Sequence, residues 1–507
     1  MIRSKICLSL TGSTLAEDLA ILDKYRNWID IAELRADYLN ADERLEIRKF
    51  PELAKIPCIL SIRRTIDGGK FEDGEASRTV LFARGLAFAN QDSRKNFAYI
   101  DIETDFNVPS IQDAALAFGT RIIRSSYVKE EPIGNLANRI SKLRVAGFEI
   151  PKVSYEPRSL SDITQLFHQA RQFKEFDQII AVRGQLALPS RILATKLHSL
   201  FTYTLPKELL DDKRPHGGID PISLSEIYNF DSIDDDTNIF AITGYPILHA
   251  LSPKIHNEAY RAHKMNNVFI PLRAQKIEES IEFAEELSVR AMTISRPFKN
   301  TVKDFIPTID EDAGYSFTCD AIIRDDNDTW SGFNLCAKAL SDTLCEFIGL
   351  KNLSGMKIAI IGSGAEARTA AYVVKSLKGK ACVFNNPISQ AKKIADQFSF
   401  KSSSLSEESQ IQIGDYSDLI IQTKTENADI VRYGGLDIVY DPIPFYEFTG
   451  NEYVFDCTYN PQQNPLLVRA ERAGCNTANS FEMIQKQARA HFELFTGVPY
   501  DKKSDTE

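Results

Sequence analysis

Eight short β-type runs recur at a regular spacing in the first 204 residues, and this rhythm restricts the fold more than any other feature. Segments with helical spacing of apolar residues, such as residues 162–173, separate most of the runs. Eight strand–helix units within about 230 residues predict an α/β fold that closes into a (β/α)8 barrel. An open doubly wound sheet also alternates, but no glycine-rich phosphate turn accompanies these runs, which favours the barrel. The expected strands are 5–10, 29–34, 58–62, 98–102, 121–125, 150–153, 177–182 and 199–203.

A different pattern begins at residues 356–361, where an apolar strand runs directly into a glycine-rich turn and then a helix. This order predicts a Rossmann lobe, in which the turn and the helix N-terminus bind the pyrophosphate of a dinucleotide. The next strand, 381–386, ends about 20 residues later, where ribose selectivity is set. The predicted cofactor-binding residues are Gly362, Ser363, Gly364, Ala365, Asn385 and Asn386.

The segment 211–236 is rich in Asp, Pro, Gly and Ser and predicts a boundary near residue 236. We expect four parts: a barrel over 1–230, a further α/β lobe over 237–345, the nucleotide lobe over 352–478 and a C-terminal helix over 479–500. The apolar face of that helix predicts that it packs back on the second part.

Composition favours small-molecule chemistry in a cytoplasmic protein. The 60 basic and 70 acidic residues give a net charge of −10 without a long basic block, so we expect no nucleic-acid partner. No apolar run approaches the roughly 18 residues of a membrane span, so we expect no membrane partner. The eight cysteines are scattered without a C-x-x-C pair, which indicates a reducing compartment and no structural metal site. The sequence does not indicate an oligomeric state.

Charged residues lie where the barrel strands end, and chemistry in such barrels occurs at those ends. Lys152 stands in an apolar strand end, where a lysine can lose its proton and attack a carbonyl as an amine. The alternative is a structural ion pair between Lys152 and Glu33 or Glu103.

Several short motifs at the expected strand ends resemble those of type I 3-dehydroquinate dehydratase. They are Glu33-Leu34-Arg35-Ala36-Asp37, Ser61-Ile62-Arg63, Tyr99-Ile100-Asp101-Ile102-Glu103, Lys152 and Ser190-Arg191. The resemblance implies that Lys152 forms an imine with the substrate ketone and that Arg191 pairs with the substrate carboxylate. It also implies that Glu33, Arg35 and Arg63 bind the hydroxyls and tune the lysine.

The chain departs from this family at the acid/base histidine, because Ser125-Ser126-Tyr127 puts Tyr127 in its place. We therefore predict Tyr127 as the residue that moves the proton, although a phenol does so less readily than an imidazole at neutral pH. His216 is an alternative base if its loop covers the site, and otherwise a surface histidine. The family's serine and glutamine of that loop are absent from residues 214–218.

The second half resembles shikimate dehydrogenase. The matching motifs are residues 244–257, Thr293-Ile294-Ser295-Arg296-Pro297-Phe298-Lys299, Tyr459-Asn460-Pro461, and Met483 followed by Gln487. The resemblance implies hydride transfer from a reduced nicotinamide to 3-dehydroshikimate, with Lys299 as the proton donor. Ser252, Ser295 and Gln487 are the implied substrate-binding residues.

Two departures concern charge. Cys336 stands where the family has a partner aspartate, and Asp320 stands where an asparagine is usual, so we predict that Asp320 supplies the catalytic carboxylate. The arginine that binds an adenosine 2′-phosphate is also absent, with Asn385-Asn386-Pro387 at that point. The resemblance implies NADP as the cofactor, and these neutral residues leave NAD open as well.

Together these features predict a bifunctional shikimate-pathway enzyme. Its barrel would dehydrate 3-dehydroquinate, and its second half would reduce 3-dehydroshikimate to shikimate. The alternative is a diverged family member that binds ligand or nucleotide as a regulatory module and has lost one or both activities.

Overall fold

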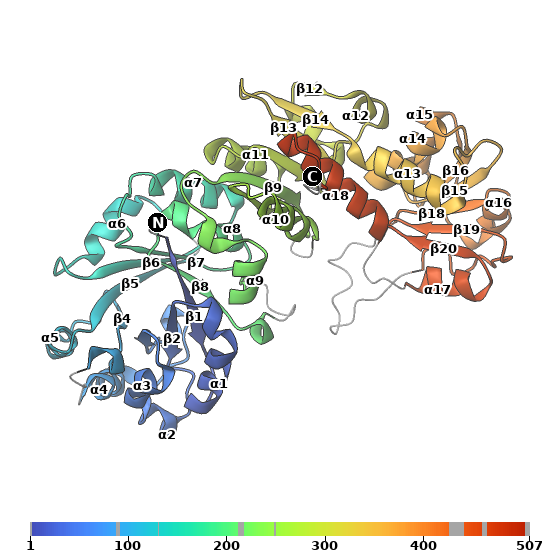
Figure 1. Ribbon diagram of the computed structural model, residues 1–507. Helices are drawn as coiled ribbons and strands as arrows, with labels where there is room; N and C mark the ends of the chain where they lie inside the picture. Colours follow the sequence, from blue (N-terminus) through green and yellow to red (C-terminus); the bar gives the residue numbers. More distant parts are fainter. Residues whose placement is uncertain are drawn as a thin grey trace, which may run out of the picture. The chain divides into compact units, whose positions relative to one another are not determined.

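The computed structural model describes residues 3–87, 92–129, 131–210, 217–247, 250–424, 441–458 and 464–501 (Figure 1). By its internal contacts the chain separates into two compact units. The first comprises Met1–Phe240, Asn257–Gln275 and Glu279–Val289, and the second comprises Ala241–His256, Lys276–Glu278 and Arg290–Glu507. Among the described residues, no helix combines the length and the apolar content that a membrane crossing requires.

The first unit contains the expected barrel. Its eight strands follow the order β7-β6-β5-β4-β3-β2-β1-β8, and the paired strands are parallel. The ring closes at a parallel bridge between Gln178 and Ser199, where the Leu200 amide donates to the Gln178 carbonyl at 2.7 Å. This closure confirms the barrel over the open sheet. The strands are β1 (Lys5–Leu10), β2 (Ile31–Arg35), β3 (Cys58–Ser61), β4 (Tyr99–Glu103), β5 (Arg121–Lys129), β6 (Ile150–Glu156), β7 (Ile179–Val182) and β8 (Phe201–Thr204).

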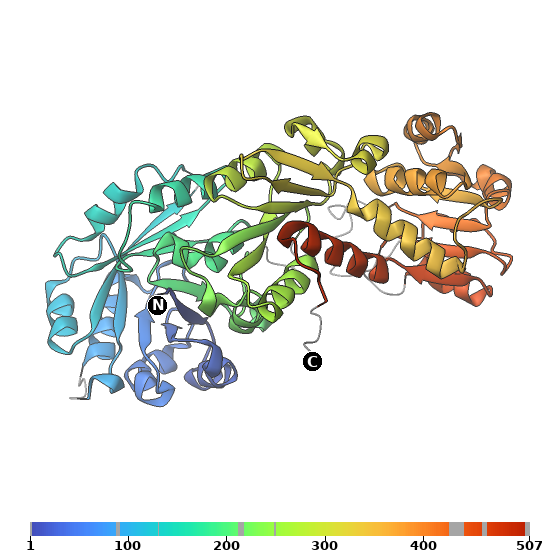
Figure 2. The same cartoon turned by 45° about the horizontal axis from the view of Figure 1, so that its top comes forward.

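Helices follow the barrel strands and cover their outer face (Figure 2). Helix α7 illustrates how the sequence sets one of them. Ser159 and Asp162 form a capping box at its N-terminus, and Ile163, Leu166 and Phe167 are buried on one face. The helices are α1 (Leu15–Tyr25), α2 (Ala41–Arg44), α3 (Phe50–Ala54), α4 (Gly74–Leu86), α5 (Pro109–Ala117), α6 (Leu136–Leu143), α7 (Leu160–Ala170), α8 (Leu188–Ile192) and α9 (Pro221–Glu226).

The barrel interior is built in tiers, because alternate residues of a strand face the same side. The lowest tier is apolar and takes one residue from each strand: Cys7, Ile31, Ile59, Tyr99, Ile123, Ile150, Ile179 and Phe201. Two residues farther along, the same face carries mostly polar side chains: Ser9, Glu33, Ser61, Asp101, Ser125, Lys152 and Tyr203. Charges buried in this second tier must be paired. The period of two therefore turns the residues of the predicted site toward one another.

The following segment forms a mixed six-stranded sheet in the order β10-β9-β11-β13-β14-β12. Strand β13 is antiparallel to both β11 and β14, so this part of the chain does not continue a simple parallel alternation. Its elements are β9 (Asn238–Gly244), α10 (Ser252–Ala262), β10 (Asn267–Arg273), α11 (Ile277–Glu286), β11 (Ala291–Ile294), β12 (Thr308–Ile309), α12 (Glu311–Ser316), β13 (Ala321–Arg324), β14 (Trp330–Phe333) and α13 (Leu335–Ile348).

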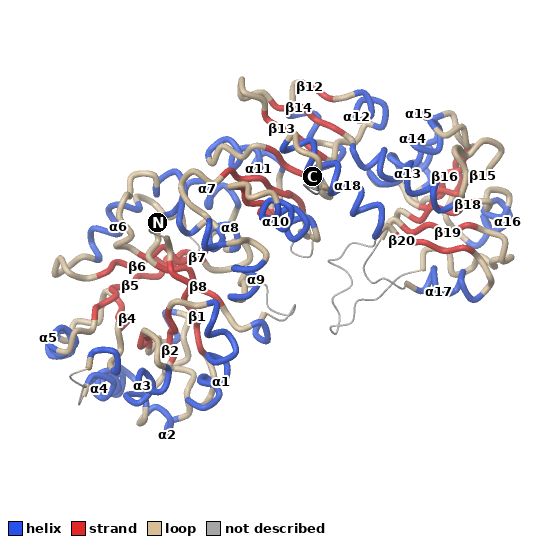
Figure 3. The backbone as a smooth tube through the Cα atoms, viewed as in Figure 1, coloured by secondary structure: helices blue, strands red, loops and turns tan. Residues whose placement is uncertain are grey.

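The third sheet has the strand order β17-β16-β15-β18-β19-β20, and all its pairs are parallel. Its strands are among the segments drawn in red in Figure 3. Numbered within this sheet, the order is that of the Rossmann fold, which confirms the predicted nucleotide lobe. Its elements are β15 (Lys357–Ile361), α14 (Ala365–Ser376), β16 (Lys380–Phe384), α15 (Ile388–Phe398), β17 (Lys401–Ser403), α16 (Gln410–Gly414), β18 (Leu419–Gln422), β19 (Tyr453–Asp456), α17 (Pro465–Arg472) and β20 (Asn476–Asn479). Helix α18 (Phe481–Thr496) follows.

Candidate active sites

Lys152 lies inside the barrel, where the strand register brings it to two carboxylates. Its Nζ is 2.7 Å from Asp101 Oδ2 and 3.7 Å from Glu33 Oε1, and its side chain is only 4% exposed. The ring of Tyr203 lies beside the ammonium, with its centroid 4.2 Å from Nζ. The structure thus contains the ion pair with Glu33 that the sequence offered as an alternative, and adds Asp101 as the nearer partner.

Nearby cations lower the pKa of both carboxylates, Asp101 and Glu33. Burial by itself raises the pKa of Asp101, but Arg63 and Lys152 outweigh burial and hold the pKa below its ordinary value. Burial and the same two cations act on Glu33, together with Arg35, and the pKa of Glu33 is also lowered. Both groups are therefore ionised at neutral pH, which keeps negative charge around the lysine.

Glu33 is held on both oxygens. Ser9 Oγ donates to Oε2 at 2.6 Å, and Ser61 Oγ donates to Oε1 at 2.8 Å. These hydrogen bonds fix the carboxylate so that it faces the lysine. Ser9 was not predicted as a site residue, but the alternation along β1 puts it in the same tier as Glu33.

The predicted arginines have different partners. Arg35 makes two hydrogen bonds with Asp37, at 2.9 and 2.8 Å, whereas Arg63 Nη2 donates to Asp101 Oδ2 at 2.7 Å. Arg191 donates to the backbone carbonyls of Tyr203 and of Val182. Burial, followed by the nearby Arg183, lowers the pKa of Arg191 to about 10. Arg191 is therefore a partly buried cation without a carboxylate partner in the described part of the barrel, which leaves its charge available to an anion.

Tyr127 is paired rather than isolated. Its hydroxyl donates to Glu156 Oε2 at 2.6 Å, and the Arg183 guanidinium lies 4.9 Å from the centre of its ring. Burial, followed by the hydrogen bond and the charge of Glu156, raises the pKa of Tyr127 to about 12. The residue is a neutral phenol at physiological pH. Sequence reasoning missed Glu156, which belongs to the site because β6 continues beyond the expected residue 153. His216, the alternative base, lies outside the described residues.

Lys299 occupies the second site. It lies in a single 3-10 turn (Phe298–Asn300) after β11, and its Nζ is 3.4 Å from Glu366 Oε1 in the first turn of α14. Burial lowers the pKa of Lys299, but Glu366, followed by Cys336 and Asp320, outweighs burial and raises it above the ordinary value. The lysine is therefore charged at neutral pH and can donate a proton.

Asp320 is anchored to the start of helix α13. Its carboxylate accepts hydrogen bonds from the backbone amides of Leu335 at 2.9 Å and Cys336 at 2.6 Å. Helix α18 supplies two further partners: Gln487 Nε2 at 2.7 Å and His491 Nε2 at 3.4 Å. The structure thus brings predicted Asp320 and Gln487 together and adds His491, which the sequence did not single out. That Asp320 takes over the role of the carboxylate missing at Cys336, as a partner of Lys299, remains a prediction.

The two predicted serines lie in different local structures. Ser252 is the first residue of α10, and Ser295 follows β11 directly. The Ser295 amide donates to the Thr243 carbonyl of β9 at 2.8 Å, which joins the ends of the two strands. Of the motifs behind this prediction, Leu248, His249 and Tyr459-Asn460-Pro461 lie outside the described residues.

The glycine turn has the geometry that a dinucleotide needs. Gly362 has a φ of +121°, and a Cβ at this position would lie 2.5 Å from Thr423 Oγ1. Gly364 caps α14 without a side-chain hydrogen bond, and no backbone atom would meet a Cβ there within 4 Å. Backbone amides at the helix N-terminus are thus left to bind a phosphate. The turn fits a nicotinamide dinucleotide.

Uncharged groups surround the expected ribose position. Gln390 Oε1 accepts from Ser363 Oγ at 2.9 Å and from Asn385 Nδ2 at 3.3 Å. Asn386 Nδ2 donates to the Leu405 carbonyl at 2.9 Å. The predicted residues Ser363 and Asn385 therefore share Gln390, which sequence reasoning missed, whereas Asn386 has a separate partner in the Leu405 carbonyl.

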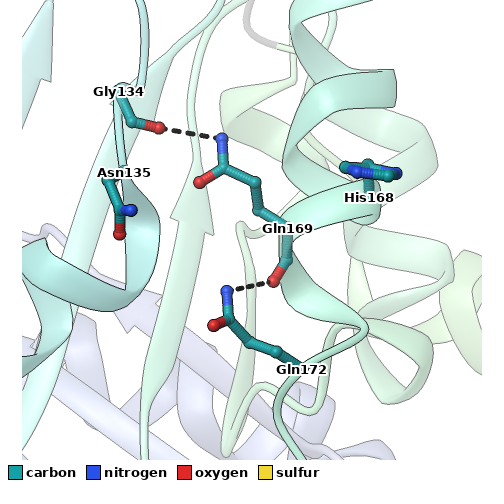
Figure 4. Close-up of a pocket in the computed structure, with 5 residues that line it drawn as sticks. All are labelled: Gly134, Asn135, His168, Gln169 and Gln172. Carbon is teal, nitrogen blue, oxygen red and sulfur yellow. Dashed lines mark hydrogen bonds between the residues drawn. The ribbon is translucent and has the colours of Figure 1, made fainter.

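A separate pocket of about 590 Å³ lies outside the barrel interior, between the start of α6 and helix α7 (Figure 4). Its lining residues are Gly134, Asn135, His168, Gln169 and Gln172, none of which was predicted as a site residue. Gln169 Nε2 donates to the Gly134 carbonyl at 2.8 Å, and its Oε1 accepts from the Leu136 amide at 2.8 Å. These contacts hold the loop before α6. The lining contains neither a lysine nor a carboxylate, so this pocket is not the site proposed for either reaction.

Comparison with known proteins agrees with this division. Residues 6–235 match the family described as type I 3-dehydroquinase. Residues 242–319 match the family described as shikimate dehydrogenase substrate binding domain. Together the two matches span more than half of the chain.

Individual relatives repeat the pattern. The bifunctional 3-dehydroquinate dehydratase/shikimate dehydrogenase, chloroplastic, of Arabidopsis thaliana is 23% identical and covers 94% of this chain and 79% of its own length. The shikimate dehydrogenase (NADP(+)) of Carboxydothermus hydrogenoformans is 28% identical and covers 52% of this chain and 94% of its own. A solved structure, the dehydroquinate dehydratase and shikimate dehydrogenase from S. pombe, is 18% identical, covers 98% of this chain and 97% of its own, and has a TM-score of 0.41. The chain therefore matches the type I 3-dehydroquinase family in its first part and the shikimate dehydrogenase substrate binding domain directly after it, and over most of its length it is similar to the bifunctional protein of Arabidopsis thaliana.

Proposed function

We propose that the chain dehydrates 3-dehydroquinate to 3-dehydroshikimate in its barrel and reduces 3-dehydroshikimate to shikimate in its second half. The observation that carries the proposal is the position of two lysines, one buried and one partly buried. Lys152 lies among ionised carboxylates inside the barrel, and Lys299 lies beside the turn that fits a dinucleotide. The names of the relatives supply the substrate class.

In the barrel, the amine of Lys152 attacks the substrate ketone and forms an imine with loss of water. The protonated imine then acidifies the neighbouring C–H bond. We assign removal of that proton to Tyr127, which passes its own proton to Glu156 across their 2.6 Å hydrogen bond. Glu156 then returns its proton through Tyr127 to the adjacent hydroxyl, which leaves as water. Hydrolysis of the imine releases the product and restores Lys152.

Charge inside the barrel supports the binding of a hydroxylated acid. The guanidinium of Arg191 pairs with the substrate carboxylate, since its geometry matches two oxygens. Glu33, Arg35 and Arg63 bind hydroxyl groups and keep the lysine oriented. Asp101 joins them as the residue that holds both Arg63 and Lys152.

In the second half, Lys299 donates a proton to the oxygen of the ketone as it becomes an alkoxide. Bound reduced nicotinamide supplies the hydride for this reduction. Ser252, Ser295 and Gln487 bind the substrate's carboxylate and hydroxyls, and Asp320 holds Gln487 in place through their 2.7 Å hydrogen bond.

We propose NADP as the cofactor, because the similar shikimate dehydrogenase carries NADP(+) in its name. Gly362, Ser363, Gly364 and Ala365 would hold the pyrophosphate. The neutral pair Asn385 and Asn386 would face the adenosine ribose, so NAD is the second cofactor to be tested.

We further propose a cytoplasmic location and the domain boundaries expected from the sequence. All eight cysteines are free thiols, in agreement with a reducing compartment. Contacts of helix α18 with Asp320 support the proposal that residues 479–500 pack on the preceding substrate lobe.

Two assays test the two activities separately. Borohydride reduction in the presence of 3-dehydroquinate should add a stable mass to the peptide that contains Lys152, and Lys152→Ala should remove it. Lys142→Ala, on the outer helix α6, is the control and should keep the adduct. If the wild-type peptide stays unmodified, the barrel is not an imine-forming dehydratase.

The second assay mixes the full chain with shikimate and either NADP⁺ or NAD⁺. Absorbance of the reduced nicotinamide should rise with at least one of the two, and Lys299→Ala should abolish the rise. A flat trace with both cofactors, accompanied by nucleotide binding, would support the non-catalytic alternative.

A further inference from the structure

The carboxylate nearest to Lys299 comes from the nucleotide-binding turn. Glu366 is the second residue of α14, directly after the predicted pyrophosphate-binding residues Gly362–Ala365. Its Oε1 lies 3.4 Å from Lys299 Nζ, and the two side chains are 22% and 16% exposed. In the described part of the chain, no other carboxylate lies within 4.0 Å of this ammonium.

The remaining charged or titratable groups that face Lys299 are Asp320, Cys336, Cys457 and Arg296. The carboxylate oxygens of Asp320 already contact the backbone amides at the start of helix α13 and the side chains of Gln487 and His491. Burial raises the pKa of Cys336 to about 12, so its thiol carries no negative charge at neutral pH. Burial also raises the pKa of Cys457 well above its ordinary value. Arg296 adds a like charge.

We propose that Glu366 is a positioning residue for the reduction: it keeps Lys299 protonated and directed at the substrate oxygen, a task that the thiol of Cys336 cannot perform. This inference rests on the reductase function proposed above. The proton donor is thereby tied to the helix whose N-terminus would receive the nucleotide pyrophosphate.

Electrostatics supports this assignment in addition to the 3.4 Å distance between Lys299 Nζ and Glu366 Oε1. A partly buried ammonium loses its proton readily unless an opposite charge lies close to it. Glu366 also lies in the first turn of a helix, where the helix dipole favours a negative charge. Its own pKa is lowered, because Lys299 and Arg296 outweigh the effect of burial. The carboxylate is therefore ionised at the pH where reduction takes place.

A labelling experiment tests the pair without turnover. Competitive acylation with acetic anhydride over a pH series, followed by peptide mass spectrometry, measures the pKa of Lys299 in the cofactor-free full chain. Exposed Lys351 in the same chain serves as the internal reference. Glu366→Gln should shift the titration of Lys299 downward by at least about one pH unit. Glu311→Gln, at an exposed first-turn glutamate of α12, should leave it unchanged.

An unchanged Lys299 titration in Glu366→Gln would overturn the proposal, whether or not the reductase assay succeeds. Glu366→Ala is the second variant, and circular dichroism checks that each variant is folded. The two failures are distinguishable, because inactivity of the wild type refutes the proposed function while labelling still reports on the ion pair.

The pH profile of reduction is the second readout. Loss of Glu366 should move the alkaline limb of kcat to lower pH, while KM for 3-dehydroshikimate changes less than threefold. Glu366→Asp should restore part of the shift. A loss of rate by the same factor at every pH indicates a merely structural role and contradicts the proposal.

Discussion

Arg63 and Lys152 share a single oxygen of Asp101: the guanidinium Nη2 and the ammonium Nζ each lie 2.7 Å from Oδ2. All three side chains are at most 4% exposed. One carboxylate thus holds two cations inside the barrel, and it sets the position of the lysine that is proposed to form the imine.

Asp101→Asn should destabilise the barrel by about 3–5 kcal/mol at neutral pH, because it takes the nearest carboxylate from two buried cations. The folded pKa of Asp101 is lower than its ordinary value near 3.9, so its contribution is present above that value and is lost as the pH falls through the folded pKa. The difference from wild type should therefore shrink below about pH 4.

Urea unfolding measures this difference, followed by the fluorescence of Trp28 in a Trp330→Phe background. Trp28 lies in the barrel unit and Trp330 in the other. Asp113→Asn, on an exposed site of α5, is the control. Equal stability of Asp101→Asn and wild type at pH 7 would contradict the assigned role.

Tyr127→Phe should lower kcat of the dehydration by about 100-fold or more, the usual contribution of an acid/base group, with little change in KM. The pKa of Tyr127 is raised to about 12, so the phenol is neutral and the loss should be the same from pH 6 to pH 9. A dehydratase assay under saturating substrate measures it.

The matched control is Tyr228→Phe, a buried tyrosine of the same unit. If Tyr127→Phe keeps kcat within threefold of wild type, the proton is moved by another group.

Gly362→Ala should weaken nucleotide binding and lower the thermal midpoint. The new Cβ meets Thr423 Oγ1 at 2.5 Å, in addition to the strain of a φ of +121° that costs about 1–3 kcal/mol. Gly355→Ala separates the two effects, because Gly355 has a φ of +90° but no atom within 4 Å of its added Cβ. Calorimetric titration with NADP⁺ should show weaker binding for Gly362→Ala alone. Equal NADP⁺ affinities of the two variants would show that the contact between the added Cβ and Thr423 Oγ1 does not affect nucleotide binding.

Asn386→Arg should raise the ratio of kcat/KM with NADP⁺ to kcat/KM with NAD⁺ by about tenfold, since a guanidinium adds a charge-assisted hydrogen bond to the 2′-phosphate. The ratio cancels any general loss from breaking the hydrogen bond of Asn386 to the Leu405 carbonyl. Initial rates of shikimate oxidation measure it. Asn352→Arg, at an exposed position before β15, is the control and should leave the ratio unchanged. An unchanged ratio for Asn386→Arg would show that the adenosine ribose does not lie at Asn386.

Much of the fold follows from local patterns. Strand–helix alternation indicated all eight barrel strands, and the apolar run before Gly362 located β15 and the Rossmann lobe. These features are readable because strand alternation, helical spacing and glycine turns are properties of neighbouring residues. Some strand ends differ from the prediction: β2 begins at Ile31 instead of 29, and β6 continues to Glu156 instead of ending at 153. The antiparallel pairing of β13 was not foreseen, because pairing direction depends on distant parts of the chain.

The sequence by itself identified the two lysines, the arginines and the glycine turn, since each stands in a short motif. Only the tertiary structure decided their partners. Asp101 meets Lys152 across 51 positions, Glu366 meets Lys299 across 67, and Gln487 meets Asp320 across 167. The physical reason is that a charge in the interior takes whichever opposite charge the packing brings within about 4 Å, and neither composition nor spacing along the chain records that distance.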